Sequence, residues 1–433
     1  MDPARFRQEL ARCNRCGFCQ AACPVFHVTG HEAGVARGRL SLISALVEGA
    51  LPWSREVEEP LFNCLLCGAC TAHCFPAVPT ADLMVAAREA YLERTGPSRM
   101  HRLLFEHLLP HPARLRLMVR LAGRAGDPRL LELAKALGLL RFLGRDFPEV
   151  FGLLGRPAGP AFRERIEPQV LTGRGKDLRL AYFVGCGMDL VRPEAAAASL
   201  ELMLDMGRSV TVLPNNCCGL PAQAYGDVEA ARNLARRNLK LLSGRSYDLV
   251  ITDCSSCAAF LKSYPALFTG EDEGGEAAAG LASRVRDLVE VLDRADAGRG
   301  RLAIPAAVTY HDPCHAVRGQ GFSQEPRQAL GRVQGIEFRE MEEADWCCGG
   351  AGAYSLGHYT LARRIMERKS NNIRRSEAEL VVSSCPSCLI HLEYGCRLQG
   401  LPVRALHLSQ VVLAGRQGGR LGVSGPAREK AGC

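Results

Sequence analysis

The chain holds four cysteines between positions 64 and 74, arranged as C-x2-C-x2-C-x3-C, and the same arrangement stands between positions 13 and 23. These eight cysteines form an octet of two motifs, and the whole chain of 433 residues holds 20 cysteines. A hydrophobic content of 47% and a charged content of 23% are ordinary for a globular protein, so the chain can bury apolar cores without covalent crosslinks. We therefore expect the thiols to act as ligands or redox groups and not as disulfide staples.

The sequence has no apolar run long enough for a transmembrane helix, which needs about 18 or more residues. Its beginning, MDPARFRQELARC, lacks the apolar stretch of a secretory signal. We expect a cytoplasmic protein, either free or held peripherally on the inner face of the membrane.

The net charge of +8 is uneven, because residues 97–179 hold 16 Lys and Arg against 8 Asp and Glu. That segment has no nucleic-acid-binding motif and few aromatic residues for stacking, so we expect no nucleic-acid partner. Two interpretations of the basic segment stay open: a solvated helical face, or a docking surface for an acidic protein or an anionic membrane.

The first repeat defines an N-terminal domain at residues 1–97. Apolar residues recur at helical spacing in 34–50, between the two cysteine motifs, and in 80–96, after the second motif. We predict an α-helical module here, followed by a basic, mostly helical linker over residues 98–177 that is interrupted by several prolines.

A second, longer repeat fills the remainder of the chain and predicts two α/β domains, at residues 178–300 and 301–433. Buried-strand runs such as LRLAYF and YDLVIT alternate with helical stretches, which indicates mainly parallel strands. Five cysteines follow strand ends in each copy, and equivalent cysteines are separated by 128, 130, 130, 131 and 131 residues. The first pentad is Cys186, Cys217, Cys218, Cys254 and Cys257, and the second pentad is Cys314, Cys347, Cys348, Cys385 and Cys388.

The doubled C-x2-C-x2-C-x3-C motif is typical of proteins with two [4Fe-4S] clusters. The first three cysteines of each motif bind one cubane, and the fourth reaches the other. We predict a cluster 1 set of Cys13, Cys16, Cys19 and Cys74, and a cluster 2 set of Cys64, Cys67, Cys70 and Cys23. Zinc is disfavoured because its two CxxC pairs usually lie a dozen or more residues apart.

The spacing of the cysteines in the two pentads does not decide which metal or redox group they form. Five thiols exceed one tetrahedral zinc site, and they suit an iron–sulfur cluster with an extra ligand or a cluster beside a redox thiol. Zinc and purely redox thiols stay as alternatives. Cys396 and Cys433 lie outside both repeats and are expected to be free thiols.

Basic residues near the cysteines have several possible roles. We expect His311 and His315, which flank Cys314, to cap a helix or to orient ligands more readily than to bind metal themselves. Arg37 and Arg39, between the two octet motifs, either raise a cluster potential or solvate the loop. No dinucleotide, phosphate-binding, serine-hydrolase or zinc-protease motif is present, so the sequence favours an electron conduit with any substrate oxidation on another chain.

The segments CNRCGFCQAACPVF and GVARGRLSLISALVEG, followed by CLLCGACTAHCFP, resemble the iron–sulfur subunit of bacterial glycolate oxidase. The two α/β domains resemble the cysteine-rich CCG domain, which this subunit shares with heterodisulfide reductase, lactate-utilisation proteins and anaerobic glycerol-3-phosphate dehydrogenase. The resemblance covers nearly the whole chain and is weakest over 98–177. Phe75 departs from the family pattern, because Cys-Pro is usual at positions 74–75.

The resemblance implies a partner FAD-linked oxidase subunit that oxidises a 2-hydroxy acid, glycolate or lactate. Electrons then pass through the two [4Fe-4S] clusters towards quinone or a membrane-associated acceptor, with FAD on the partner alone. In the heterodisulfide reductase relatives, CCG cysteines hold noncubane clusters that act on disulfides, and by that similarity each pentad forms one such site. Because both pentads are complete here, a thiol–disulfide oxidoreductase subunit is the alternative function.

Overall fold

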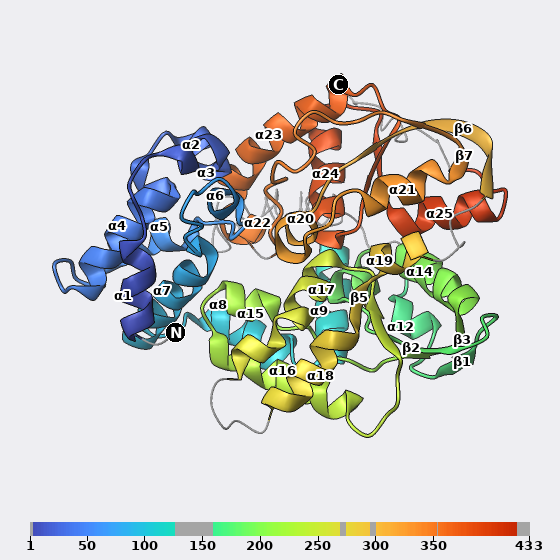
Figure 1. The fold of residues 1–433 in the computed structure, drawn as a ribbon, viewed down its shortest axis with the longest axis horizontal. Coiled ribbons are helices and arrows are strands. Elements are labelled where there is room, and N and C mark those ends of the chain that lie inside the picture. Colours follow the sequence, from blue (N-terminus) through green and yellow to red (C-terminus); the bar gives the residue numbers. More distant parts are fainter. Residues whose placement is uncertain (1–2, 126–158, 269–273, 295–299, 353, 422–433) are drawn as a thin grey trace.

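The computed structural model describes residues 3–125, 159–268, 274–294, 300–352 and 354–421. The helical N-terminal module, drawn in blue, lies beside two α/β domains, the first in green to yellow and the second in orange to red (Figure 1). The predicted fold class, a helical ferredoxin-type module followed by two α/β domains with mainly parallel strands, is confirmed. None of the helices in the described ranges is both long enough and apolar enough to cross a membrane.

Short helices alternate with the two cysteine loops in the N-terminal module. Ile43, Leu61 and Leu83 are fully buried in the core that holds these helices together. The helix predicted after the second motif is α7, and it ends just before Gly96, whose φ of 76° is easily adopted by glycine. The helices are α1 (Pro3–Ala11), α2 (Phe18–Ala22), α3 (Pro24–Thr29), α4 (Ala36–Val47), α5 (Glu58–Phe62), α6 (Ala69–Ala72) and α7 (Thr80–Thr95).

The segment between the module and the first α/β domain is not helical throughout. It begins with α8 (Arg99–Arg102), a π-helical turn (Leu103–Leu108) and α9 (Pro112–Ala125), while residues 126–158 lie outside the described ranges. It then forms α12 (Phe162–Arg165) and strand β1 (Val170–Thr172), which pairs antiparallel with β3 (Gly207–Val212). The end of the predicted linker therefore supplies an edge strand to the first sheet.

The first α/β domain contains a five-stranded sheet of order β1-β3-β2-β4-β5. Apart from β1, its strands are parallel: β2 (Leu178–Tyr182), β3 (Gly207–Val212), β4 (Leu249–Thr252) and β5 (Val285–Asp287). Its strands carry apolar runs because helices cover the parallel sheet on both faces. These helices are α13 (Cys186–Leu190), α14 (Pro193–Met206), α15 (Leu220–Ala224), α16 (Val228–Leu242), α17 (Ser255–Lys262), α18 (Gly275–Arg284) and α19 (Leu288–Arg294).

The second α/β domain repeats this plan in a four-stranded parallel sheet of order β7-β6-β8-β9. The strands are β6 (Gly300–Tyr310), β7 (Val333–Phe338), β8 (Leu380–Ser383) and β9 (Arg404–His407). The helices are α20 (Cys314–Gln320), α21 (Glu325–Gly331), α22 (Tyr354–Gly357), α23 (Tyr359–Arg375), α24 (Pro386–Leu398) and α25 (Leu408–Arg416). In both sheets the three strands that precede cysteines are neighbours, β3-β2-β4 and β7-β6-β8.

The two α/β domains meet at the carboxyl ends of β4 and β8. The Ser255 amide donates to the Ser384 carbonyl at 3.0 Å, and the two hydroxyls lie 2.8 Å apart. His407 Nε2 lies 2.9 Å from the Asp253 carbonyl oxygen. Apolar side chains of both sheets belong to one continuous core. The ends of the sheets that precede the cysteines therefore face each other.

The N-terminal module packs against the second α/β domain through a separate apolar cluster. Val25 and Leu65 of the module are buried with Tyr354 and Ile365 of the second domain. The Tyr354 hydroxyl donates to the Asn63 carbonyl at 3.0 Å, next to Cys64. This contact brings the second octet motif close to the second pentad.

Candidate metal centres

The two octet loops adopt the same backbone shape. Arg15 and Leu66, which occupy equivalent places before the second cysteine of each motif, have φ values of 55° and 53°. Gly17 and Gly68, just after that cysteine, have φ values of 91° and 70°. Such turns expose consecutive backbone N–H groups on a concave side, which suits an anionic cluster. The sequence repeat is thus also a repeat of backbone geometry.

Each predicted octet set surrounds a cavity. One cavity, with about 380 Å³ of empty space partly open to solvent, is lined by all four cysteines of the cluster 2 set. The other, with about 390 Å³, is lined by all four cysteines of the cluster 1 set and also by Cys70. The last cysteine of each motif has crossed to the other motif's cavity, as two-cluster ferredoxins require. Thiol donors around a cavity of this kind fit a [4Fe-4S] cubane.

Two buried arginines lie beside the cluster 2 set. Arg39 donates to the Pro60 carbonyl at 3.0 Å and to Asn63 Oδ1 at 2.6 Å, and it lines the cavity. Arg88 donates to the Leu61 carbonyl at 2.9 Å and to the Cys64 carbonyl at 2.7 Å. Sequence reasoning singled out Arg39 but missed Arg88, because only the tertiary fold brings α7 against this loop.

Arg37 lies beside the cluster 1 set and is more exposed. It pairs with Glu32 and donates to the Arg15 carbonyl at 3.3 Å. Burial raises the pKa of the nearby Cys19 thiol, and Arg37 acts in the opposite direction. The two arginines that the sequence singled out therefore belong to different cavities.

The first pentad gathers at the carboxyl ends of β3, β2 and β4. Hydrogen bonds join Cys186 to Cys217, Cys217 to Cys218, Cys218 to Cys257 and Cys257 to Cys254. Hydrogen bonds from Cys217 and Cys257 hold the pKa of Cys218 well below its ordinary value. Gly219, with φ at 102°, allows the sharp turn after the vicinal pair. All five predicted thiols of this domain thus lie together in one group.

The second pentad gathers at the equivalent place in the other sheet. Cys347, Cys348, Cys388 and Cys385 form a hydrogen-bonded row, and Cys314 interacts electrostatically with Cys348 and Cys385. Hydrogen bonds from Cys347 and Cys388 hold the pKa of Cys348 well below its ordinary value. The amides of Gly349 and Gly350 donate to the Cys347 and Cys348 sulfurs at 3.5 Å.

Further thiol contacts connect the sets with one another. Cys254 hydrogen-bonds Cys385, so the two pentads touch where the α/β domains meet. Cys347 hydrogen-bonds Cys67, and this bond lowers the pKa of Cys67 to about 6. The second pentad therefore lies between the cluster 2 set and the first pentad.

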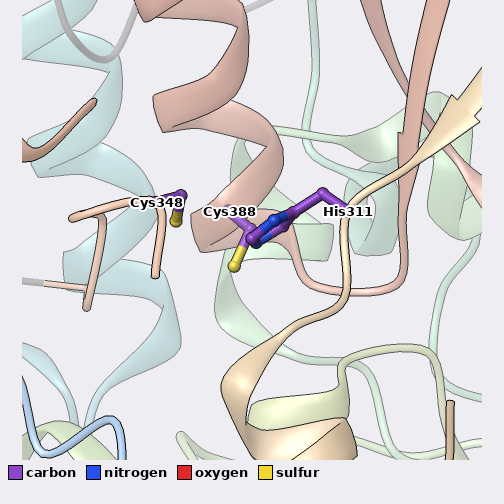
Figure 2. A group of neighbouring side chains, drawn as sticks. All are labelled: His311, Cys348 and Cys388. Carbon is purple, nitrogen blue, oxygen red and sulfur yellow. The ribbon is translucent and has the colours of Figure 1, made fainter. Parts of the chain in front are cut away.

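The histidines near Cys314 have distinct environments. His315 Nδ1 lies 2.9 Å from Ser256 Oγ, which in turn lies 3.3 Å from the Cys385 sulfur, so its contact is indirect. His311 does not cap α20, whose N-cap residue is Pro313. Its ring lies directly against the second pentad (Figure 2). The HDPCH motif signalled a histidine beside the site, but the contact depends on the folded strand end.

The other two cysteines lie apart from these sets. Cys396 is buried within α24, and burial raises its pKa to about 12. Cys433 lies outside the described residues. Every cysteine in the described part of the chain is free of disulfide bonds.

Comparison with known protein families matches three parts of the chain. Residues 9–77 match the 4Fe-4S dicluster domain, and residues 180–262 and 308–393 match the cysteine-rich domain called CCG. The fold and the cysteine sets therefore define an iron–sulfur protein with a dicluster module and two cysteine-rich domains.

Similar proteins narrow this class. The chain is 33% identical over 417 residues to the probable glycolate oxidase iron–sulfur subunit of Bacillus subtilis, covering 94% of each chain. It is 26% identical to the glycolate oxidase iron–sulfur subunit of Escherichia coli, covering 88% of this chain and 89% of that protein. It is also 28% identical to a fumarate reductase (CoM/CoB) subunit of Methanothermobacter marburgensis, covering 91% of this chain and 70% of the relative.

The chain belongs to the family of glycolate oxidase iron–sulfur subunits, as the sequence motifs predicted. Among solved structures, a hypothetical protein from Helicobacter pylori shares the fold with a TM-score of 0.52 at 10% identity, covering 95% of this chain and 72% of that one.

Proposed function

We propose that this chain is the electron-transfer subunit of a flavin-dependent 2-hydroxy-acid dehydrogenase, acting on glycolate or lactate through a partner FAD-linked oxidase subunit. The observation that carries the proposal is the row of cysteine sets. It begins at the cluster 1 set, continues through the cluster 2 set and the second pentad, and ends at the first pentad. The glycolate oxidase subunits among the chain's relatives support the substrate class.

The roles of individual residues follow from their placement. The octet cysteines hold two [4Fe-4S] clusters, which supply one-electron carriers when bound. The pentads hold further iron–sulfur centres. Arg39 and Arg88 place positive charge beside the cluster 2 set. The chain itself offers no flavin motif, so hydride removal belongs to the partner.

Electrons enter at the cluster 1 set, because this end of the row faces solvent. Cys16 is exposed. Phe18, next to Cys19, is 67% exposed and Phe75, next to Cys74, is 95% exposed. Exposed aromatic side chains are enriched where proteins dock. These two rings form the contact for the flavoprotein, and the final acceptor is quinone or a membrane-associated carrier that takes electrons further along the row.

A second function is a thiol–disulfide oxidoreductase subunit. Both pentads are complete and touch at Cys254 and Cys385, and the similarity to the fumarate reductase (CoM/CoB) relative spans most of the chain. In this case the pentads are the reaction site for a disulfide, and the octet clusters supply its electrons.

The test combines the tagged, anaerobically reconstituted chain with the FAD-linked oxidase that co-purifies with it. We expect no dye reduction with glycolate or lactate by the chain alone, and reduction of its iron–sulfur absorbance by substrate once the flavoprotein is added. The Phe75→Ala variant should keep its iron and lose most of the rate of reduction by the flavoprotein. Leu398→Ala, which removes an exposed apolar side chain of the second α/β domain, is the matched control.

Turnover by the chain alone, free of flavin, would contradict the electron-transfer function. Reduction of a disulfide by the chemically reduced chain, without any response to the hydroxy acids and the flavoprotein, would favour the second function. A rate in Phe75→Ala equal to that of the unmodified chain would move the docking site elsewhere.

A further inference from the structure

We propose that His311 is a nitrogen ligand of the iron–sulfur centre at the second pentad, so that the two cysteine-rich domains hold chemically different centres. This inference rests on the proposed function in one respect, namely that the pentads bind iron–sulfur centres. It adds a ligand outside both pentads and makes one centre distinct from the other.

The geometry of three side chains carries the proposal. A ring nitrogen of His311 and the sulfurs of Cys348 and Cys388 all lie within 4.8 Å of one another (Figure 2). Among the described residues, this is the one trio of histidine, cysteine or carboxylate donors that comes so close together. His311 follows β6, Cys348 lies in the loop after β7 and Cys388 lies on α24, so three separate elements converge on this point. Metal sites of imidazole and thiolate are built from such convergent donors.

His311 has a nitrogen atom to spare. The residue is 1% exposed, and its Nδ1 atom has no hydrogen-bond partner. Buried polar atoms in proteins are almost always satisfied, so the unpartnered Nδ1 is an exception, in a ring that also interacts with the Cys348 thiol. A metal bound by this imidazole would use its spare nitrogen.

The side-chain nitrogens of two other residues near this site, His391 and Lys369, already have hydrogen-bond partners. His391 Nδ1 lies 2.6 Å from the Cys348 carbonyl oxygen. The buried Lys369 donates to the carbonyls of Glu343 and Ala344. These groups support the loop of the vicinal pair, and they leave His311 as the nitrogen available to a metal.

The first α/β domain provides an internal comparison. Its residue equivalent to His311 is Phe183, three positions before Cys186, and its residue equivalent to His391 is Phe260, three positions after Cys257. Both phenylalanines are buried. The same backbone plan thus surrounds one pentad with apolar rings and the other with imidazoles. A thiolate ligand in place of a neutral imidazole lowers the reduction potential of an iron–sulfur centre.

The experiment uses the full chain, reconstituted with iron and sulfide and labelled with ¹⁵N in histidine. Pulsed EPR of the reduced protein should show a histidine nitrogen coupled to one centre. His311→Phe, which installs the residue of the first domain, should abolish this coupling. His391→Phe is the matched control and should keep it, because His391 bonds a backbone carbonyl.

A second variant separates the loss of a ligand from the loss of the folded structure. His311→Cys supplies a thiolate in place of the imidazole, and it should retain the iron content while losing the nitrogen coupling and lowering the potential of that centre. Absence of any nitrogen coupling in the unmodified chain, with its iron intact, overturns the assignment of His311 and leaves the proposed function standing. If Cys347→Ser and Cys217→Ser both leave the iron content and spectra unchanged, the pentads bind no iron, and this part of the proposed function fails with the inference.

Discussion

At the scale of single residues, two arginines show how the protein places charge next to its thiols. Burial raises the pKa of the Cys23 thiol, and the positive charge of Arg39 opposes this effect. Arg88 is buried nearby, and burial lowers its pKa to about 10, so it is still protonated at neutral pH. Both guanidinium groups are hydrogen-bonded to backbone carbonyls, which fixes them beside the cluster 2 set. Positive charge at this place favours the reduced, more negative state of a cluster.

We predict that Arg39→Met lowers the reduction potential of the cluster held by Cys23, Cys64, Cys67 and Cys70. One unit charge about 8 Å away, at an effective dielectric constant of about 20, is worth about 2 kcal/mol, or roughly 90 mV for one electron. Redox titration followed by EPR measures the shift. Arg39→Lys is the control, since it keeps the charge and should shift the potential much less. Equal potentials in all three proteins would mean that Arg39 only packs the loop.

At the scale of elements, the strand–turn–helix unit that presents the vicinal cysteines depends on glycine. Gly349 has a φ of 81°, and a Cβ atom there would lie 2.8 Å from the Ala362 carbonyl oxygen of α23. Gly352, three residues on, has a φ of 59° but no atom within 4 Å of the same position. Both glycines have a left-handed backbone conformation, but only at Gly349 would an added Cβ atom meet neighbouring atoms.

We therefore expect Gly349→Ala to displace Cys347 and Cys348 and to remove the spectrum of the second pentad. Gly352→Ala should keep that spectrum and lose only about 1–2 kcal/mol of unfolding free energy, the cost of left-handed backbone for a residue with a Cβ. Iron analysis and chemical denaturation of the two variants separate the outcomes. If the centres stay intact in the Gly349→Ala variant, α23 can move away from the added Cβ atom at little cost.

At the scale of the whole molecule, the packing of the three domains decides which cysteine sets are neighbours. The N-terminal module contacts the second α/β domain through Tyr354 and through Arg318, whose side chain lies 3.5 Å from the position of a Cβ on Gly68. The module also reaches the first α/β domain, because Arg88 donates to the Ala224 carbonyl. The cluster 2 set and the second pentad are held together by these contacts, with Cys67 against Cys347.

Because the cluster 2 set lies next to the second pentad, we predict magnetic coupling between the centres that these two sets hold. In the fully reduced protein, the EPR signal of the cluster 2 set should be broadened or split by the centre of the second pentad. Cys347→Ser should remove the part of the splitting that comes from the second pentad and leave the coupling between the two octet clusters. Cys217→Ser, the equivalent change in the first pentad, should leave the splitting in place. A cluster 2 signal that is identical in all three proteins would contradict the close approach.

The sequence by itself determined the helical module and the two parallel α/β domains, and it predicted how the cysteines fall into sets. Their signals are local: fixed spacings within a loop, helical periodicity in 80–96, and apolar runs such as LVIT and LVVS that end just before a cysteine. Family membership followed from the same motifs. The edge strand β1 was not predicted from the sequence, because its three residues become a strand only by pairing with β3.

Only the tertiary structure decided how these parts meet. The contacts of Cys67 with Cys347 and of Cys254 with Cys385 join residues that are far apart in the sequence, and they depend on how entire domains pack. The burial of Arg88 and the position of His311 beside Cys348 and Cys388 have the same origin. Spacing along the chain can show which thiols share a loop, but the distance between loops is set by the cores that hold the domains together.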